Sequence, residues 1–537
     1  MKQVARSAHV DTFTRENLPP RATWPDFLFT LPELQYSPSL NCAAELLDRH
    51  VQAGAGGQRC LVTDTEMWTY ADLLRRSNQV AQILAEDASL VSGNRVLLRG
   101  PNNPWLVASW LGVIKAGGVA VTTMPLLRAG ELRTMAEIAD LNLAICDHRF
   151  IQELESAAIP GLKTLLYGGA AQDDVASLAD AKPAEFENVA TAADDVCMLA
   201  FTSGTTGKPK ATMHFHRDVL AIADTFSRHV LQPTPDDLFA ASPPLAFTFG
   251  LGQSVVFPLR ARAAVFLLEQ PSPPRLLEAV ERHGITVLAT APTAYRAMVP
   301  DLGAARLTTL RACVSAGETL PKATWEAVHD ACGMRIIDGI GSTELLHIFI
   351  SASGHDIRPG TTGRAVPGYV AEVQDEDGRP VSDGELGRLA VKGPTGCRYL
   401  RGDRQATYVH DGWNITGDVY VRDRDGYFQY QARADDMIVS AGYKIAGPEV
   451  EEALLRHPAV AEVAVIGSPD EERGMLVKAV VVLRPGAELG PEPVRTLQDF
   501  VKSQIAPYKY PRAIEFADAL PRTATGKLQR FRLRERS

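Results

Sequence analysis

Short apolar runs alternate with helical stretches from about residue 42 to residue 169 and again from residue 238 to residue 338, and this alternation strongly constrains the fold. Strands that alternate with helices are typical of βαβ units, which build parallel sheets. We therefore predict an α/β fold with two stacked, doubly wound layers. The stretch between them, residues 173–194, is acidic, alanine-rich and poorly periodic, so we expect a connector there. In the first layer we predict strands at 59–64, 95–98, 119–123, 143–146 and 164–167, with helices at 70–85 and 104–115. In the second layer we predict strands at 238–241, 264–268, 286–290, 312–315 and 335–338, with helices at 274–283 and 324–331.

Turn signals such as Pro-Gly and Asp-Gly become frequent after about residue 360. Their spacing between short apolar runs favours a small antiparallel β subdomain at about residues 360–430. A compact α+β pattern follows from residue 435, with helices at 448–456 and 492–505, strands at 460–466 and 476–483, and a basic tail. Because 537 residues are too many for one core, we predict an N-terminal domain of residues 1–434 and a small, mobile C-terminal α+β domain of residues 435–537.

Charge and cysteine usage narrow the class of partner. The formal net charge of -9 gives no general attraction to nucleic acid or to an anionic membrane. No apolar run approaches the roughly 18 residues of a membrane span, and the N-terminus lacks the apolar core of a signal peptide. The seven cysteines stand singly between Cys42 and Cys397, as is typical of reduced thiols in the cytoplasm. We expect a cytoplasmic protein that binds small molecules, with no nucleic acid or membrane partner; monomer and homodimer both stay open.

Residues 201–210, Phe-Thr-Ser-Gly-Thr-Thr-Gly-Lys-Pro-Lys, combine hydroxyls, two glycines and two lysines after an apolar run at 196–201. Glycines let backbone N–H groups turn toward an anion, and hydroxyls and ammoniums add donors, so this composition favours a phosphate-binding loop. It is not a Walker A loop, because only two residues separate its glycines and Pro209 stands where a Ser or Thr is required. An ordinary surface turn is the alternative. A helix is expected after Pro209.

Three further clusters carry polar groups at predicted turns. Residues 338–344, Asp-Gly-Ile-Gly-Ser-Thr-Glu, follow a predicted strand at the sheet edge where doubly wound folds bind ligands, although Ser342 or Thr343 could equally cap a helix. Asp418 follows a Thr-Gly pair. Its carboxylate either accepts hydrogen bonds from the hydroxyls of a ribose or belongs to a common turn. Lys527 lies in a Thr-Ala-Thr-Gly-Lys segment that reads either as an ordered loop or as part of a basic tail.

Taken together, the four clusters resemble the adenylate-forming superfamily of acyl-CoA synthetases, peptide-synthetase adenylation domains and luciferases, in the same order and over nearly the whole chain. The chain is most similar to benzoate-CoA and 2-aminobenzoate-CoA ligases. That similarity rests on Asp-Gly-Ile-Gly-Ser-Thr-Glu-Leu-Leu-His-Ile-Phe at 338–349 and, as a softer signal, on Asp-Thr-Phe-Thr-Arg-Glu-Asn-Leu-Pro-Pro at 11–20. The resemblance implies an ATP-dependent aryl-CoA ligase that uses Mg²⁺, forms an acyl-AMP with release of pyrophosphate, and then transfers the acyl group to coenzyme A. The alternatives are an aryl-acid adenylating enzyme that loads a carrier protein, a ligase for a short or medium-chain acid, and a non-catalytic nucleotide sensor.

The resemblance also implies residue roles. Contacts to the ATP phosphates fall on Thr202, Ser203, Gly204, Thr205, Thr206 and Lys210. Glu344 matches the carboxylate that holds Mg²⁺, Thr343 a hydroxyl on the α-phosphate, and Lys527 the catalytic lysine of adenylation. The adenine and ribose positions fall on Ser315, Ala316, Gly317, Glu318, Asp338, Gly339, Asp418 and Arg433. The hinge and the surface that faces the site during thioester formation fall on Asp435, Gly442, Tyr443 and Lys444, while Arg473 and Lys478 are either CoA contacts or solvated charges.

An apolar acyl pocket is implied as well, lined by Phe247, Thr248, Phe249, Ile340, Gly341, Leu345 and His347. Phenyl rings beside a glycine suit a flat aromatic acid better than a long acyl chain. His347 either bonds an ortho substituent or is a core histidine. Two departures from the wider family stand out: Ile340 occupies the position of a Tyr that stacks on adenine, and Phe247 that of a His. His214 and His216 lack further ligands in sequence, so we expect no zinc site there.

Overall fold

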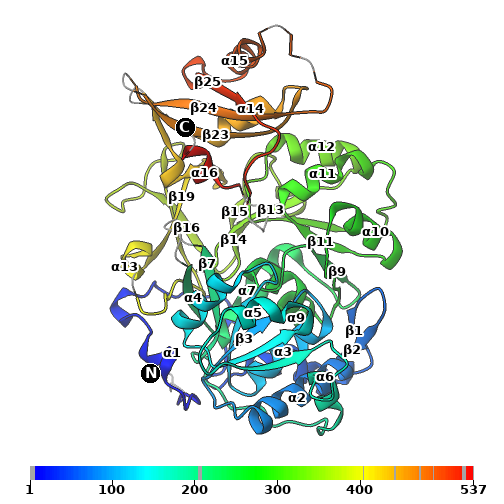
Figure 1. Ribbon diagram of the computed structural model, residues 1–537. Coiled ribbons are helices and arrows are strands. Elements are labelled where there is room, and N and C mark those ends of the chain that lie inside the picture. Colours follow the sequence, from blue (N-terminus) through cyan, green and yellow to red (C-terminus); the bar gives the residue numbers. More distant parts are fainter. Residues whose placement is uncertain are drawn as a thin grey trace.

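The computed structural model describes residues 6–203, 209–402, 404–440, 443–470, 473–487, 489–490, 492–522 and 528–535. Figure 1 shows the first α/β layer at the bottom of the molecule, the second reaching from there to the middle right, the strands around β16 and β19 at the left, and the C-terminal strands β23–β25 at the top. The α/β class and the division into a large N-terminal part and a small C-terminal α+β part are confirmed by the sheets. No helix among the described residues is both long and apolar enough to cross a bilayer.

The first layer is a six-stranded sheet in the order β6-β5-β3-β4-β7-β8. Its strands are parallel except for β8, which runs antiparallel to β7. The bounds are β3 (Arg95–Arg99), β4 (Val119–Thr123), β5 (Leu143–Asp147), β6 (Lys163–Tyr167), β7 (Val196–Ser203) and β8 (Pro209–Phe215), with helices α2 (Tyr70–Gln82), α3 (Pro104–Lys115), α4 (Ala129–Ala139), α5 (Ile151–Ser156) and α6 (Val175–Asp180).

Local signals set these helices. Thr69 and Asp72 form a reciprocal capping box at the start of α2. Asn103 accepts the N–H of Leu106 at 3.0 Å, and Pro104 takes the first position of α3, where its missing N–H costs nothing. Both helices therefore begin where the sequence predicts. The short helix α6 lies within residues 173–194, where the sequence predicted only a connector.

The helix predicted after Pro209 is wrong. Residues 209–215 form β8, and α7 (His216–Ile222) begins only afterwards, where Asp218 accepts the Phe215 N–H at 2.9 Å. Ala211 to Phe215 are all buried, so this strand lacks the alternation that marks a strand with one exposed face. Its pairing with β7 supplies the backbone hydrogen bonds instead.

The second layer is a nine-stranded sheet in the order β15-β14-β13-β12-β11-β9-β10-β1-β2. Here β1 pairs in parallel with β10, so the strand predicted at residues 59–64 belongs to the second layer and not, as predicted, to the first. Its strands are β1 (Arg59–Val62), β2 (Met67–Thr69), β9 (Leu238–Ala241), β10 (Ala264–Phe266), β11 (Val287–Thr290), β12 (Ala312–Ser315), β13 (Ile336–Gly341), β14 (Ile348–Ser351) and β15 (Arg364–Ala365). Its helices are α8 (Thr248–Leu251), α9 (Phe257–Ala261), α10 (Pro273–His283), α11 (Pro292–Leu302) and α12 (Lys322–Cys332).

The remaining strands form two five-stranded sheets. The first is the predicted antiparallel β subdomain, with β16 (Val370–Gln374), β17 (Leu386–Lys392), β18 (Val409–His410), β19 (Trp413–Arg422), β20 (Phe428–Arg433) and the short helix α13 (Gln405–Tyr408). The second is C-terminal, with β21 (Ile438–Ser440), β22 (Tyr443–Ile445), α14 (Gly447–Leu455), β23 (Val460–Asp470), β24 (Gly474–Leu483), α15 (Pro493–Gln504), β25 (Ala513–Phe516) and α16 (Arg530–Arg534). The sequence missed β21, β22, β25 and α16. This sheet has its own apolar cluster, and the domain boundary at residue 434 stays a prediction.

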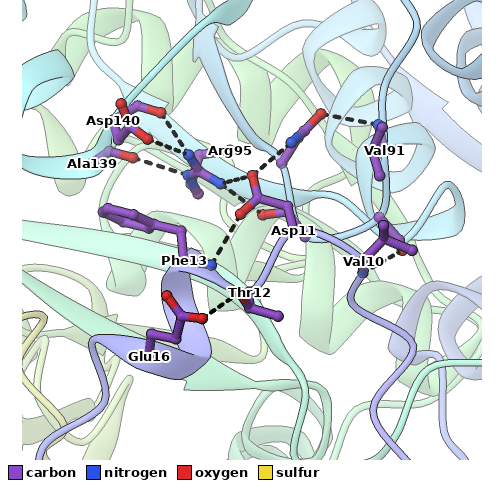
Figure 2. Close-up of polar contacts among 12 residues, drawn as sticks. Val10, Asp11, Thr12, Phe13, Glu16, Val91, Arg95, Ala139 and Asp140 are labelled. Carbon is purple, nitrogen blue, oxygen red and sulfur yellow. Dashed lines mark hydrogen bonds and ion pairs between the residues drawn. The ribbon is translucent and has the colours of Figure 1, made fainter.

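An N-terminal arm, residues 8–17, is bonded to the first layer through Asp11 (Figure 2). Asp11 pairs with the buried guanidinium of Arg95 and accepts the Asn94 amide at 2.7 Å and the Phe13 N–H at 3.0 Å. Arg95 also donates to the carbonyl of Ala139 at 3.0 Å and to that of Asp140 at 2.8 Å. The charge of the buried Arg95 guanidinium is therefore neutralised by Asp11, and this pair fixes residues 11–13 to the start of β3.

Replacing Asp11 with Asn should lower the midpoint of the first thermal transition at pH 7, because a hydrogen-bonded buried charge pair contributes about 1.5–3 kcal/mol. Although burial opposes it, the Phe13 N–H and Arg95 hold the pKa of Asp11 below its ordinary 3.8. A lowered pKa gives stability that is present above the ordinary value and is lost as pH falls through the folded value. The difference in midpoint between wild type and variant should therefore be full above pH 3.8, shrink as the pH falls below that value, and vanish once the pH is below the folded pKa of Asp11.

Asp140→Asn is the matched control. This side chain contacts the same guanidinium at 3.1 Å, but it is 70% exposed and its φ of 50° suits Asn. The interpretation is wrong if the two variants melt alike at pH 7, measured by differential scanning calorimetry.

Candidate active site

The turn after β13 carries Glu344 at the carboxyl edge of the second layer. Ser342 Oγ accepts the Leu345 N–H at 3.2 Å, and the Thr343 carbonyl accepts the Leu346 N–H at 3.2 Å. Leu346 has a φ of 70°, a left-handed conformation that is costly for a leucine. The two hydroxyl residues therefore cap a tight turn and not a helix, and strained turns of this kind concentrate at functional sites.

Tyr399 contacts both Glu344 and Lys210, the second lysine of the predicted phosphate-binding loop. Its hydroxyl donates to Glu344 Oε1 at 2.6 Å, and the Lys210 ammonium lies 5.4 Å from the centroid of its ring. Burial first, and then the neighbouring Glu344 carboxylate, raise the pKa of Tyr399, so the hydroxyl stays protonated and acts as a donor. A cation and a carboxylate thus converge on one buried tyrosine.

Tyr399 is not among the residues that the sequence predicts for the site. Its position beside Thr212 of β8 is fixed by an isolated bridge between two segments far apart in sequence. Gln405 holds the same segment by accepting the Tyr399 N–H at 3.0 Å and donating to the Cys397 carbonyl at 2.9 Å. No local pattern in residues 397–405 signals this role.

The β7–β8 hairpin places Thr202 opposite Lys210. Burial lowers the pKa of Lys210, as does the nearby Arg404 charge, while Glu344 opposes the shift. Gly204, Thr205 and Thr206 lie outside the described residues, as does the side chain of Ser203. The described ends of the loop thus bring Lys210 to the Glu344 turn.

Asp418 and Arg433 face each other across the β19–β20 ladder. Arg433 donates to Asp418 Oδ1 at 3.0 Å and to the Thr416 carbonyl at 3.1 Å. Between them Gly417 has a φ of 78°, and a Cβ there would lie 2.9 Å from the Arg433 guanidinium. The predicted pair therefore exists, and the glycine allows its close approach.

Neighbouring strands β12 and β13 end side by side, with Ser315 opposite Asp338. Ser315 Oγ and Asp338 Oδ1 are both buried without a hydrogen-bond partner among the described residues. Burial raises the pKa of Asp338 to about 8, and the adjacent Gly339 N–H opposes that shift. Beyond them Gly317 has a φ of 89°, and Glu318 pairs with Arg522 at 3.6 Å. Buried polar atoms without partners at a sheet edge indicate a ligand site.

His347 packs in an aromatic cluster. Its ring centroid lies 4.6 Å from that of Phe257, 5.4 Å from that of Phe226 and 5.8 Å from that of Phe249. Burial lowers the pKa of His347 to about 3, and neither ring nitrogen has a hydrogen-bond partner among the described residues. A Cβ on Gly252 would lie 2.4 Å from this ring. The histidine is therefore neutral and enclosed by apolar rings.

Of the predicted pocket residues, Phe249 contacts His347 directly, and Gly341 lies against the His347 backbone, which a Cβ there would approach to 2.7 Å. Leu345 is fully buried in the main apolar cluster, and Ile340 is half-buried against it. Phe247 accepts the Leu251 N–H at 2.8 Å, and Thr248 starts α8. The sequence missed Phe226 and Phe257, which lie elsewhere in the chain and carry no motif.

The C-terminal candidates are described only in part. Lys527 and Gly442 lie outside the described residues, as do the side chains of Asp435 and Lys444. Tyr443 is 56% exposed and stacks on Tyr508 at 4.6 Å. Lys478 pairs with Glu515 at 2.9 Å, within the C-terminal sheet.

The two histidines set aside in the sequence analysis have separate environments. His214 Nε2 lies 2.9 Å from the Thr212 hydroxyl. His216 Nδ1 accepts the Cys42 N–H at 3.2 Å and, with the Cys42 and Cys197 thiols, forms a buried group whose ligand atoms lie within 4.8 Å of one another. Among the described residues these three ligands are fewer than the four of a closed structural zinc site, and the Cys42 N–H already bonds Nδ1, the ring nitrogen 3.3 Å from Cys42 Sγ.

Comparison with known proteins gives one consistent picture. Residues 47–399 match the AMP-binding enzyme family, and residues 449–527 match the AMP-binding enzyme C-terminal domain. The chain is 36% identical over 515 residues to the benzoate–CoA ligase of Thauera aromatica, covering 94% of this chain and 98% of that protein. The crystal structure of the anthranilate CoA ligase AuaEII in complex with anthranoyl-AMP superposes with a TM-score of 0.89 at 33% identity, covering 94% of this chain and 99% of that one. A benzoate CoA ligase from Burkholderia xenovorans LB400 gives a TM-score of 0.85 at 33% identity, covering 92% and 100%.

Proposed function

The chain belongs to the AMP-binding enzyme family, and we propose that it is an AMP-forming aryl-CoA ligase that activates an aromatic carboxylic acid of the benzoate or 2-aminobenzoate type. One observation carries the proposal: Lys210 and Glu344 converge on Tyr399 at the sheet edge, next to an aromatic cluster. A cationic loop and a hard carboxylate suit a nucleotide triphosphate with its metal, and the phenyl rings suit a flat acid.

In the first half-reaction a carboxylate oxygen of the acid attacks the α-phosphorus of ATP, and the bond to the β-phosphate breaks to release pyrophosphate. Both reactants are anionic, so catalysis depends on charge neutralisation and in-line positioning. We assign phosphate binding to Thr202, Ser203, Gly204, Thr205, Thr206 and Lys210. Thr343 contacts the α-phosphate, and Lys527 neutralises the attacking carboxylate and the α-phosphate.

The nucleoside lies along the strand ends. We assign ribose recognition to the Asp418–Arg433 pair, whose 3.0 Å contact preorganises the carboxylate. The adenine lies along Ser315, Ala316, Gly317 and Glu318, with Asp338 and Gly339 beneath it. The unpartnered Ser315 hydroxyl and Asp338 oxygen are then available to it.

Glu344 would hold Mg²⁺ together with phosphate oxygens. The fit rests on the donor set, because a carboxylate and phosphate oxygens are the hard ligands that Mg²⁺ prefers. When bound, Mg²⁺ neutralises charge on the phosphates. Tyr399 fixes one Glu344 oxygen at 2.6 Å and so orients the carboxylate.

In the second half-reaction the CoA thiol attacks the acyl carbon, the C–S bond forms, and the C–O bond to AMP breaks. We assign the hinge for this step to Asp435 and a CoA-facing surface to Gly442, Tyr443 and Lys444. Tyr443 supports that surface, because its ring stacks on Tyr508 on one side and is 56% exposed to a ligand that arrives after domain rotation.

The aryl pocket is assigned to Phe247, Thr248, Phe249, Ile340, Gly341, Leu345 and His347. Neutral His347 has two ring nitrogens without partners, which could serve a polar substituent on the acid. We also propose that the protein is cytoplasmic. We propose in addition that it forms a homodimer, which light scattering would test.

The test is a panel of benzoate, 2-aminobenzoate, hydroxybenzoates and medium-chain acids with ATP, Mg²⁺ and CoA, following both pyrophosphate and thioester. Aryl-CoA formation is the expected result. Pyrophosphate release without a thioester would favour loading of a carrier protein, and preference for medium-chain acids would contradict the aryl assignment. Absence of acid-dependent pyrophosphate with every acid would favour a nucleotide sensor.

Replacing Tyr399 with Phe should raise the Mg²⁺ concentration needed for half-maximal pyrophosphate release by roughly tenfold, because a hydrogen bond to a charged group contributes about 1.5–3 kcal/mol. The change removes only the hydroxyl that fixes Glu344. Tyr408→Phe is the matched control, because that hydroxyl lies 3.2 Å from Ser342 Oγ instead. Equal Mg²⁺ dependence in both variants would contradict the role of Tyr399.

A further inference from the structure

Arg522 connects the nucleotide side of the second layer to the C-terminal sheet. Its guanidinium lies 3.6 Å from Glu318 Oε1, in the segment after β12, and 2.6 Å from Glu462 Oε2 on β23. The three side chains are 29%, 17% and 41% exposed, so the bridge is half-buried. One guanidinium therefore spans two carboxylates from different parts of the fold, which suits its forked set of donors.

Arg522 also forms the base of a loop. It pairs with Leu528 in an antiparallel bridge, and the Gln529 N–H donates to the Pro521 carbonyl at 2.9 Å. Leu528 packs against a small apolar cluster of the C-terminal sheet that includes Leu520 and Ile466. The residues between Arg522 and Leu528 include Lys527. The base of the segment that carries Lys527 is thus fixed to the C-terminal sheet by apolar packing and to the N-terminal domain by Glu318.

A second arginine supports the same contact. Arg296 on α11 donates to the carbonyl of Ala461, the residue before Glu462. Burial lowers the pKa of Arg296, and the Glu462 carboxylate opposes that shift. The start of β23 is therefore held between Arg296 from the N-terminal domain and Arg522 from the C-terminal segment.

We propose that Arg522 is a positioning residue for the adenylation step, which it serves by bridging Glu318 and Glu462 and so holding the base of the Lys527 segment against the nucleotide site. The proposal rests on the proposed function. Acyl-AMP formation needs the bridge, because Lys527 has to reach the nucleotide in that step. Thioester formation from acyl-AMP does not need it, because Lys527 has no assigned role in that step.

The test separates the two half-reactions. Arg522→Ala should slow acid-dependent pyrophosphate release about fivefold, the upper end of what a half-buried ion pair contributes. The same variant should make thioester from synthetic aryl-AMP and CoA within about twofold of wild type. Arg522→Lys, which keeps the charge but not the fork, should fall between wild type and Arg522→Ala in adenylation. Arg495→Ala, which removes a 73% exposed surface arginine, is the control and should change neither half-reaction.

Charge exchange separates a specific bridge from a general structural role. Arg522→Glu alone places three carboxylates together and should be slower in adenylation than Arg522→Ala. Adding Glu318→Arg should recover part of that loss when ATP is saturating, a condition needed because Glu318 also lies along the assigned adenine position. The inference is overturned if Arg522→Ala slows both half-reactions equally, if it leaves adenylation unchanged, or if the exchanged pair shows no recovery. If the wild-type enzyme releases no pyrophosphate with any acid, it is the proposed function that fails, so the two failures are distinguishable.

Discussion

Replacing Lys527 with alanine should slow acyl-AMP formation by on the order of 10²–10³-fold, because a single preorganised donor at the reacting charges contributes about 3–4 kcal/mol to the transition state. Two anions meet in this step, and without the ammonium their repulsion is uncompensated. The measurement is the single-turnover rate of pyrophosphate release with an aromatic acid and saturating ATP.

Thioester formation from synthetic acyl-AMP is the internal control for this variant. Lys527 takes no part in our assignment of that step, so the variant should retain near wild-type thioester rates. Equal losses in the two half-reactions would contradict the role of Lys527. Arg522→Ala should show the same split on a smaller scale, since it removes the anchor of the segment and not the reacting cation.

Replacing Glu344 with Gln should slow pyrophosphate release by about 10²-fold and greatly raise the Mg²⁺ requirement. The amide keeps the size of the side chain and can still accept the Tyr399 hydrogen bond, so the change removes the charge and little else. Titrating Mg²⁺ in the pyrophosphate assay measures both effects. A full Mg²⁺ titration is required because excess metal should recover part of the rate.

Comparing Tyr399→Phe with Glu344→Gln distinguishes the orientation of the Glu344 carboxylate from its negative charge. The first leaves the carboxylate but frees it, so saturating Mg²⁺ should restore most of its rate. The second removes the ligand, so restoration should stay incomplete. If Glu344→Gln kept wild-type Mg²⁺ dependence, the metal would be held elsewhere.

Local signals predicted much of the fold. Strand β4 and helix α3 fall at the predicted residues, because apolar period and the Asn103–Pro104 cap act within a few residues. The hydrophobic pattern failed where burial does not alternate: residues 211–215 of β8 are all buried, so this run did not reveal a strand. It also failed on sheet membership, because the pairing of β1 with β10 is set by residues far away in the chain.

The same distinction applies to the site. Asp418 and Arg433 were predicted as a pair because their segments resemble the family's motifs, and the structure brings them within 3.0 Å. Tyr399, Phe226 and Phe257 could not. Each acts through a contact made by tertiary packing, and a buried aromatic residue looks the same in sequence whether it lines a site or only fills a core.

The position of β1 has a consequence for how the chain is made. Leu61 of β1 pairs with Val265 of β10, and β1 also carries the edge strand β2. During synthesis β1 and β2 therefore leave the ribosome long before their partner exists, with one edge of the hairpin unpaired. Pairing between such distant segments slows folding and exposes strand edges while the chain waits. The second layer thus closes late in synthesis, whereas the parallel strands β3 to β6 of the first layer can pair as soon as they emerge.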